Sequence, residues 1–237
     1  MKRGRSITQT ESSTYLNEAL AIWVRDLRSE FRTRYAVNAI IMFAVTTLVA
    51  VSFSIGSFRI ADNEKSFLYA VLLWIILVFS ALSGLSRSFV KEQEAGTIDT
   101  LKLSARPQAV FLGKLFFNLT LLASLELIIV PVFVLLMRYP IAHPVPFVAN
   151  VVIAGLGLGA GTTIVAAMIA QASTRGALFS ALSFPLLLPL MIMAIKGCEQ
   201  ASVRLGPVGW AEVRMAFAYL VIMVIVSLFL FPLIWEE

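Results

Sequence analysis

The chain has 237 residues, of which 59% are hydrophobic and only 14% are charged, and its mean hydropathy is +0.88. Soluble domains carry about 25% charged residues, so this composition excludes an ordinary soluble protein. The net charge of +5 does not indicate nucleic-acid binding, because membrane proteins keep excess basic residues on their cytoplasmic side. The single cysteine, Cys198, excludes an intrachain disulfide and the paired-cysteine motifs of redox, metal and haem-attachment sites.

The first 35 residues are polar and precede the first long apolar run, which begins near Ala36. A signal peptide places its short apolar core close to the start of the chain, so none is expected here. We expect residues 1–14 to be a flexible N-terminus. Residues 15–35 are expected to form an amphipathic helix that lies in the membrane interface.

This predicted interfacial helix combines an apolar stripe with a basic face. Apolar residues recur at steps of three and four, as on one face of a helix: Leu16, Leu20, Trp23, Leu27 and Phe31. The basic face carries Arg25, Arg28, Arg32 and Arg34. In the interface, such a stripe faces lipid and the arginines lie near lipid phosphates. A calmodulin-type target helix has the same pattern, but this helix runs directly into a membrane span, which favours the interfacial position.

Residues 36–237 are expected to form one membrane domain with six transmembrane helices. Between Arg34 and Arg59, and between Lys65 and Arg87, the chain holds no charged residue and no histidine. Each window is longer than the roughly 20 apolar residues that cross a bilayer as a helix. The six expected spans are about Ala36–Phe58, Phe67–Leu85, Phe111–Met137, Phe147–Gln171, Ala177–Ile195 and Met215–Trp235.

The basic residues predict the orientation of these spans. Thirteen lysines and arginines fall in the segments on the N-terminal side of the membrane, and six fall in the segments on the other side. Because basic residues concentrate in cytoplasmic loops, we expect both termini to be cytoplasmic. The segment 86–110, between the second and third spans, is then cytoplasmic as well.

Segment 86–110 carries the signals of a short helix although it lies between two apolar spans. Gly96 breaks the chain, Thr97 can cap a new turn, and Asp99 lies favourably near its N-terminus. Pro107 then stops or redirects this helix. We interpret the segment as a docking helix for a cytoplasmic protein; the alternative is an ordinary solvated loop. The apolar ridge expected to make the contact consists of Ile98, Leu101 and Leu103.

This organisation resembles the ABC-2-type permeases of ATP-binding-cassette transporters, in which an amphipathic helix precedes six spans and a cytoplasmic loop carries a Glu-x-x-x-Gly-Thr motif. Here the motif reads Glu92-Gln-Glu-Ala-Gly96-Thr97. Within that group the chain is most similar to the CcmB family, the membrane subunits of the haem-exporter-type system of cytochrome c maturation. Three segments carry the closer similarity, which extends over nearly the whole chain: Arg25-Asp-Leu-Arg-Ser-Glu-Phe-Arg32, Gly96-Thr-Ile-Asp-Thr-Leu-Lys-Leu-Ser104 and Phe184-Pro185-Leu-Leu-Leu-Pro189-Leu-Met-Ile192.

The resemblance implies an all-α integral membrane protein with the ABC-2 (ABCG-like, type V) architecture, in the inner membrane of a bacterium. It implies that segment 86–110 couples to a separate CcmA-like ATPase. Other implied partners are a second permease copy, CcmC- and CcmD-like haem-handling membrane proteins and a haem chaperone. No tightly bound cofactor is expected, since ATP enters through the partner and haem is the ligand that is handled or transported. The residues implied in ATPase coupling are Glu92, Glu94, Gly96, Thr97, Ile98, Asp99 and Leu101.

The sequence contains no Gly-x-x-x-x-Gly-Lys-Ser/Thr phosphate loop, so we expect a non-catalytic subunit that depends on a partner for ATP hydrolysis. The glycine-rich run from Gly155 to Gly161 lacks the lysine and lies inside an apolar span. Its pairs Gly155/Gly159 and Gly157/Gly161 are interpreted as small faces that let neighbouring helices pack closely.

Three residues inside the expected spans are candidates for gating. Pro185 and Pro189 each remove a backbone hydrogen bond and favour a kink in the fifth span, which is either static or a hinge for an outer gate. Glu126 is the only charged residue well inside an expected span, where acidic groups usually face a protein interior or a cavity. A structural role and a role in translocation are both open for it. His143 has no second ligand near it in the sequence, so haem ligation is the less favoured interpretation.

Two other functions fit part of this pattern. A related permease for a lipid, a polysaccharide or a drug would also bind an ATPase but would not affect c-type cytochromes. A secondary transporter or a scaffold would work without an ATPase. Secondary transporters commonly have inverted repeats with interrupted helices, and residues 36–137 and 147–235 show no such symmetry.

Overall fold

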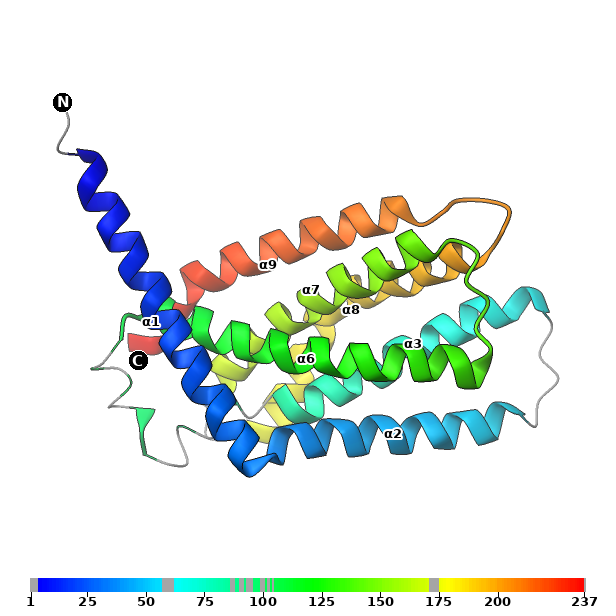
Figure 1. Ribbon diagram of the computed structural model, residues 1–237, viewed down its shortest axis with the longest axis horizontal. Helices are drawn as coiled ribbons and strands as arrows, with labels where there is room; N and C mark the ends of the chain where they lie inside the picture. Colours follow the sequence, from blue (N-terminus) through cyan, green and yellow to red (C-terminus); the bar gives the residue numbers. More distant parts are fainter. Residues whose placement is uncertain are drawn as a thin grey trace.

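The fold is that of a computed structural model, which describes residues 4–56, 62–85, 88–89, 92, 96–98, 101, 103, 105–170 and 175–236. Side chains are described for these residues except at 4–14, 35–36, 55–56, 62–63, 175–182 and 236. Within this part of the chain the long elements are all α-helices (Figure 1): α1 (Gly4–Thr33), α2 (Tyr35–Gly56), α3 (Asp62–Leu85), α6 (Pro107–Met137), α7 (Pro144–Ala170), α8 (Arg175–Ser202) and α9 (Trp210–Glu236).

Six of the described helices, all except α1, are long and apolar enough to cross a membrane. The six expected spans and the all-α membrane class are therefore confirmed, with shifted ends. Helix α7 begins at Pro144 rather than Phe147, and α8 continues to Ser202, seven residues beyond the expected end at Ile195. The ABC-2 architecture and the orientation of the spans stay predictions.

Helix α1 begins and ends earlier than the sequence indicates. It spans Gly4–Thr33 instead of 15–35, so that residues 4–14, which were expected to be flexible, are helical. Arg34 then adopts a left-handed conformation with φ of +53°, which turns the chain into α2. The Val37 backbone N–H donates to Glu30 Oε1 at 3.1 Å, so α1 caps the start of α2. Figure 1 shows α1 crossing the end of the bundle at a steep angle to α2.

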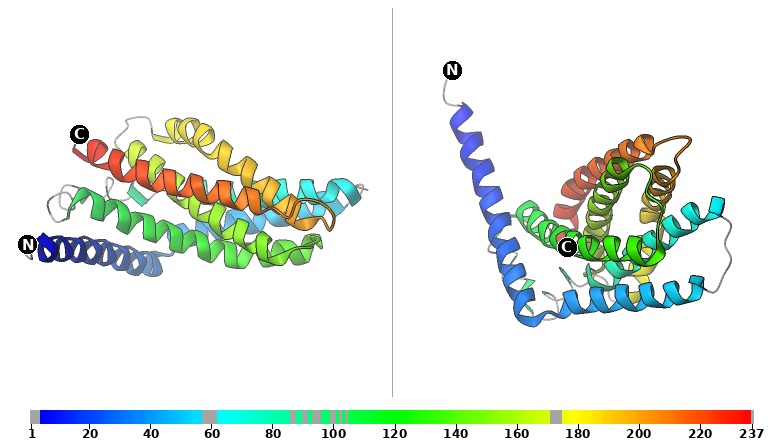
Figure 2. Two further views of the ribbon diagram at one scale, coloured as in Figure 1. Left: turned by 90° about the horizontal axis from the view of Figure 1, so that it is seen from above. Right: turned by 45° about the vertical axis from the view of Figure 1, so that its right-hand side comes forward.

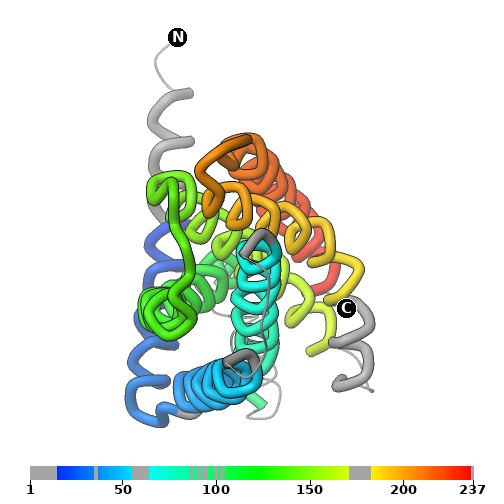
Figure 3. The backbone as a smooth tube through the Cα atoms, turned by 90° about the vertical axis from the view of Figure 1, so that its right-hand side faces the viewer, coloured from blue at the N-terminus to red at the C-terminus, as the bar shows by residue number. Residues whose placement is uncertain are grey.

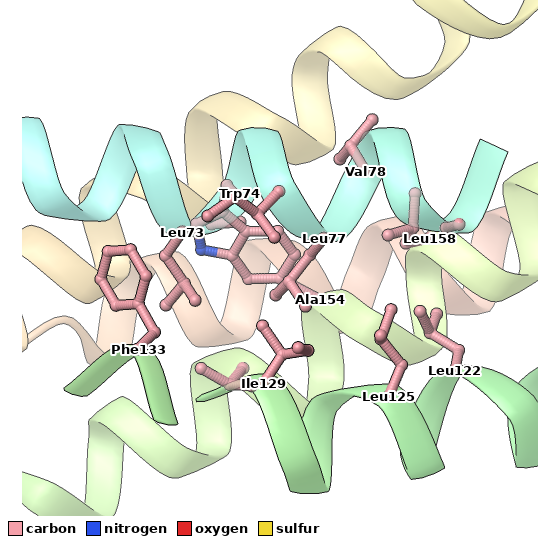
Figure 4. Close-up of a cluster of buried hydrophobic side chains, with 14 of the residues drawn as sticks. Leu73, Trp74, Leu77, Val78, Leu122, Leu125, Ile129, Phe133, Ala154 and Leu158 are labelled. Carbon is pink, nitrogen blue, oxygen red and sulfur yellow. The ribbon is translucent and has the colours of Figure 1, made fainter. Parts of the chain in front are cut away.

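The apolar core lies where α3, α6 and α7 meet. Figure 4 shows Trp74 and Leu77 of α3 beside Ile129 of α6 and Ala154 of α7, and all of them are buried. Helix α7 is the most enclosed of the described spans, since 78% of its apolar window is buried against 17% for α2. Viewed from one end, α2 lies at the edge of the bundle and α3 nearer its middle (Figure 3).

The glycines of α7 explain how closely it is enclosed. A Cβ atom at Gly155 or Gly159 would lie 1.9 or 2.5 Å from a side-chain atom of α6. At Gly157 or Gly161 it would instead crowd side chains of α8 and α9. Residues two apart on a helix differ by about 200° around its axis, so the two pairs face opposite sides. The predicted small packing faces are therefore confirmed.

One end of the bundle gathers α1, the end of α9 and the described residues of segment 86–110 (Figures 1 and 2). Phe89 of this segment packs against Phe231 and Trp235 of α9, with ring centroids 5.6 and 6.4 Å apart. Phe111 of α6 joins them, with its ring centroid 5.3 Å from that of Phe231. The two polar regions of the chain thus meet at the same end of the molecule.

Candidate coupling site

Segment 86–110 contains a helical turn that leads directly into α6. Gly96 has φ of +65°, a left-handed conformation that favours glycine. After it, the Leu101 N–H bonds to the Thr97 carbonyl at 3.0 Å, and the Ala105 N–H bonds to the Leu101 carbonyl at 3.3 Å. These bonds confirm the predicted short helix for the described residues. Pro107 then begins α6, since the first turn of a helix tolerates proline.

The apolar ridge expected on this short helix does not form an exposed surface. Ile98 is 9% exposed and Leu101 3%, and both belong to a buried cluster with Phe89 and Phe111. The predicted contact ridge is therefore wrong for these two residues, because apolar burial fastens them to the bundle instead. Leu103 is 91% exposed and remains available to a partner.

Glu92 anchors the segment through both of its carboxylate oxygens. Its Oε1 accepts a hydrogen bond from Lys114 Nζ at 3.0 Å and also contacts the Arg25 guanidinium, while its Oε2 accepts one from the Thr97 hydroxyl. The Thr97 N–H bonds to the Glu92 carbonyl at 3.1 Å. The Glu and Thr of the motif therefore bind each other and attach the turn to α6 and α1. Two further expected coupling residues lie outside the described part of the chain, Glu94 and Asp99.

Lys114 lies at the centre of a cluster of charges and is its most deeply buried member. Its side chain is 3% exposed, and its Nζ atom lies 2.7 Å from Asp26 Oδ2 and 3.0 Å from Glu92 Oε1. Arg25 contacts the same two carboxylates, at 3.0 Å in the case of Asp26. We call Arg25, Asp26, Glu92 and Lys114 the ionic hub. It joins α1, segment 86–110 and α6, and losing one buried charge from such a pair costs about 3–5 kcal/mol.

Helix α1 also holds the far end of the segment. The Arg106 backbone N–H donates to Glu18 Oε2 at 3.4 Å, and the Arg106 guanidinium lies 4.3 Å from the centre of the Tyr15 ring. Between this contact and the ionic hub, α1 packs tightly on α6, where a Cβ atom at Gly113 would lie 2.7 Å from Ile22 Cβ. Helix α1 therefore contacts the segment at both of its ends.

Polar contacts continue from the ionic hub into the bundle. One turn beyond Lys114, the buried Asn118 amide donates to Ser88 Oγ at 3.3 Å and to Thr163 Oγ1 at 2.9 Å. Thr163 in turn donates to the Gly159 carbonyl at 2.6 Å. Asn118 thus links segment 86–110 and α6 to α7, the most enclosed span.

The ionic hub favours the charged form of Glu92. Burial of the carboxyl acts to raise its pKa, but Lys114, the Thr97 hydroxyl and Arg25 together outweigh burial, and the pKa of Glu92 lies below its ordinary value of 4.5. A carboxylate whose pKa is lower in the folded state stabilises that state at pH values above its unfolded pKa. This stability is lost as the pH falls through the lowered pKa.

We therefore expect Glu92→Gln to destabilise the protein by an amount that depends on pH. The difference in thermal midpoint from the wild type should be constant down to about pH 5.5 and should shrink as the pH falls below 4.5, where the wild-type carboxylate becomes protonated too. Thermal unfolding in detergent between pH 3.5 and 7 measures it. A difference that grows on acidification would contradict the pairing of a charged Glu92.

The arginines expected on one basic face of α1 separate into two roles. Arg28 and Arg32 are exposed, as an interfacial position requires, whereas Arg25 is committed to the ionic hub. Trp23 is half-buried and donates its Nε1–H to Thr120 Oγ1 on α6 at 3.1 Å. The middle of the apolar stripe, Trp23 and Leu27, thus packs against the bundle. At its two ends Leu16, Leu20 and Phe31 stay exposed.

The gating candidates lie apart from the ionic hub. Glu126 is twelve residues beyond Lys114 on α6, a distance of about 18 Å along the helix. Pro185 and Pro189 lie on exposed positions of a different helix, α8. The expectation that Glu126 is the only charged residue well inside a span is wrong, because Lys114 also lies inside α6 and is buried.

Sequence analysis missed the roles of Asp26 and Lys114. In the sequence, Lys114 was considered only as one of the thirteen basic residues that predict the cytoplasmic side. Its position in a 31-residue apolar helix was an available signal, since ionisable residues inside spans are usually paired and functional. Asp26 gave no comparable signal, because it lies among arginines on a polar helix.

Two comparisons with known proteins found matches to this chain. The family model described as CcmB protein matches residues 17–235. The chain belongs to the CcmB family. One similar protein, heme exporter protein B of Bradyrhizobium diazoefficiens, is 27% identical over 210 residues, which cover 88% of this chain and 90% of the relative. The match to the CcmB family includes the ionic hub, segment 86–110 and all six apolar helices.

Proposed function

We propose that this CcmB-family chain is the non-catalytic membrane subunit of an ABC transporter complex for cytochrome c biogenesis. A separate CcmA-like ATPase hydrolyses ATP and closes around it. The membrane subunit converts this closure of the ATPase into haem export or into release of a haem-loaded chaperone. The ionic hub carries this proposal, because it fixes the Glu92–Thr97 motif to helix α1 and to the membrane span α6. The name heme exporter protein B, borne by a relative, supports haem as the ligand handled.

Force enters at the exposed side of the short helix that follows Gly96. Leu103 contacts the ATPase, while Ile98 and Leu101 hold the same helix against the bundle. Glu92 transfers the motion to Lys114 on α6 and to Arg25 on α1. Because α1 contacts both ends of segment 86–110, α1 and this segment move together as one unit.

The complex contains two copies of this chain and two ATPase subunits, in the ABC-2 (ABCG-like, type V) arrangement. Both termini lie in the cytoplasm, and the membrane is the bacterial inner membrane. CcmC- and CcmD-like proteins and a haem chaperone act with it on the outer side. Close grouping of α1, the end of α9 and segment 86–110 at one end of the bundle supports a single cytoplasmic face.

Motion at the ionic hub reaches the outer side through α7 and α8. Asn118 contacts α7, and α7 packs through Gly157 and Gly161 against α8 and α9. In α8 the proline segment serves as the hinge, and the Tyr219 hydroxyl of α9 donates to the Leu186 carbonyl within it at 2.9 Å. This bond supports α8 where Pro185 and Pro189 weaken its own backbone bonding.

Replacing Leu103 by glutamate tests the docking surface. We expect Leu103→Glu to lower co-purification of the ATPase about tenfold, since a charge in an apolar contact removes at least the 1–2 kcal/mol of a central interface residue. The matched control is Leu205→Glu, because Leu205 is 90% exposed and Leu103 is 91% exposed, but Leu205 lies in the turn between α8 and α9. The measurement is the ratio of ATPase to membrane subunit after affinity purification.

Full ATPase retention by Leu103→Glu would contradict the proposed docking surface. Loss of the ATPase together with normal c-type cytochromes would favour the second candidate, an ABC-2-type permease for a lipid, a polysaccharide or a drug. Haem staining of c-type cytochromes in the same membranes separates these results.

A further inference from the structure

The last turns of α8 are bound by the segment that joins α6 to α7, at the end of the bundle opposite the ionic hub. The Tyr139 hydroxyl donates to the Cys198 carbonyl at 3.1 Å. The backbone N–H groups of Ala142 and His143 donate to the Ala201 carbonyl at 3.1 and 2.8 Å. Carbonyls in the last turn of a helix have no partner within the helix. The segment between α6 and α7 therefore supplies donors that the end of α8 lacks.

Helices α3 and α7 bind the same turns of α8 through buried side chains. The Asn150 amide of α7 donates to the Ala194 carbonyl at 2.8 Å and to Cys198 Sγ at 3.2 Å. The Trp74 indole N–H of α3 donates to the same sulfur atom at 3.3 Å. We call Trp74, Tyr139, Asn150 and Cys198 the far-end lock, and each of them is at most 4% exposed. Parting these helices would leave several buried donors without an acceptor, which is costly inside a membrane.

Nearer the ionic hub, α8 contains the two positions at which it bends most easily. Pro185 and Pro189 have no backbone N–H, so two successive turns of α8 each lack one hydrogen bond. From Pro189 to Cys198 the helix continues for nine residues, or about 14 Å, without another proline. Helix α8 is therefore divided into a portion that the far-end lock holds and a portion before Pro185, with the prolines between them as a pivot.

We propose that the far ends of α3, α7 and α8 stay joined throughout the ATPase cycle and tilt together as one body, while α8 bends at Pro185 and Pro189. The far side of the membrane domain is then displaced without a path opening between these three helices. This inference rests on the proposed function and narrows it. Within one copy of the chain, the ATPase drives a displacement that releases a bound chaperone, and haem does not pass between α3, α7 and α8.

A disulfide staple across the far-end lock tests whether α7 and α8 stay joined. A Cβ atom at Gly197 would lie 2.6 Å from Asn150 Cγ, and Asn150 Cβ is one bond beyond, so cysteines at the two positions are close enough for a disulfide. Shortening Asn150 also removes the atoms that would crowd a side chain at residue 197. The stapled variant combines Asn150→Cys and Gly197→Cys with Cys198→Ser, which leaves one possible pair. The matched control carries Asn150→Ser and Gly197→Ser with the same Cys198→Ser.

We expect the stapled protein, with its disulfide verified by mass spectrometry, to support the same level of c-type cytochromes as the serine control. The level is measured by haem staining of membranes from cells that carry each variant. A lower level with the stapled protein than with the control would show that α7 and α8 have to part, and would overturn the proposal.

Spin labels decide the matter even if the stapled variant folds poorly. Val148 on α7 and Val203 just after α8 are 57% and 41% exposed, and the buried Cys198 stays in place. A non-hydrolysable ATP analogue should leave the distance between labels at these two positions unchanged in the complex with its ATPase. A shift of this distance would overturn the proposal.

A second pair of labels, at Val24 on α1 and at Val203, tests the proline pivot. The analogue should shift this distance, and Pro185→Ala combined with Pro189→Ala should abolish the shift, because alanine restores the missing backbone N–H groups. The matched control is Pro232→Ala, which removes a proline from α9 and should leave the shift intact. A shift that survives loss of both α8 prolines would overturn the pivot. Absence of the ATPase from the wild-type complex would count against the proposed function, whereas the staple reports on the far-end lock alone.

Discussion

Lys114→Met should destabilise the protein more than any other single change in the ionic hub. It removes a buried ammonium that lies 2.7 Å from Asp26 Oδ2 and 3.0 Å from Glu92 Oε1. We expect a loss of about 3 kcal/mol, the lower end for a broken buried pair, because Arg25 still contacts both carboxylates. For a chain of this size that corresponds to a thermal midpoint lower by roughly 6–12 °C, measured by unfolding in detergent.

The double variant with Glu92→Gln distinguishes electrostatics from lost packing. Removing one carboxylate as well as the lysine relieves the uncompensated charge, so the double variant should be more stable than the sum of the single effects predicts. Lys196→Met, at an exposed position of α8, serves as the control and should have little effect. Strict additivity of the two single variants would show that Lys114 and Glu92 do not interact.

Glu92→Ala should uncouple ATP hydrolysis from cytochrome c assembly. It removes the contacts of one carboxylate with Lys114, Arg25 and Thr97, and each hydrogen bond to a charged group contributes about 1.5–3 kcal/mol. The short helix then loses its ionic attachment to α6 and α1, while the exposed Leu103 still binds the ATPase. We expect c-type cytochromes to fall at least tenfold in a haem stain of membranes, with the ATPase bound and active.

The control for this uncoupling is Glu64→Ala, which removes an exposed carboxylate at the start of α3. Normal cytochrome levels with Glu92→Ala would contradict the role of the ionic hub in coupling. Loss of the ATPase from this variant would instead show that anchoring and docking use the same contacts.

The six spans and the short helix could be predicted because their signals are local. The spans are identified by windows without charged residues that are long enough, as helices, to cross a bilayer. Gly96 followed by Thr97 identifies a turn that starts a helix. The glycine faces of α7 follow from helix geometry alone. The helical structure of residues 4–14 was not predicted. These residues are polar and show no apolar periodicity, so they were expected to be flexible, whereas α1 begins at Gly4.

The ionic hub could not be predicted from sequence because it is built from distant parts of the chain. Arg25 and Glu92 are 67 positions apart, and Lys114 is 22 positions beyond Glu92. An amphipathic pattern also does not distinguish a surface that docks a partner from one that packs on its own bundle. For this reason Ile98 and Leu101 were assigned to a docking ridge, although the bundle buries them.

The central claim is that motion of segment 86–110 passes through Glu92 into α1 and α6. Spin labels at Val24 on α1 and Leu135 on α6, 43% and 77% exposed, test it directly in the assembled complex with the buried Cys198 replaced by alanine. We predict that a non-hydrolysable ATP analogue shifts the distance between the labels when Glu92 is present. The shift should be absent with Glu92→Gln although the ATPase remains bound. An equal shift in both proteins, or none with Glu92 present, would contradict transmission through the ionic hub.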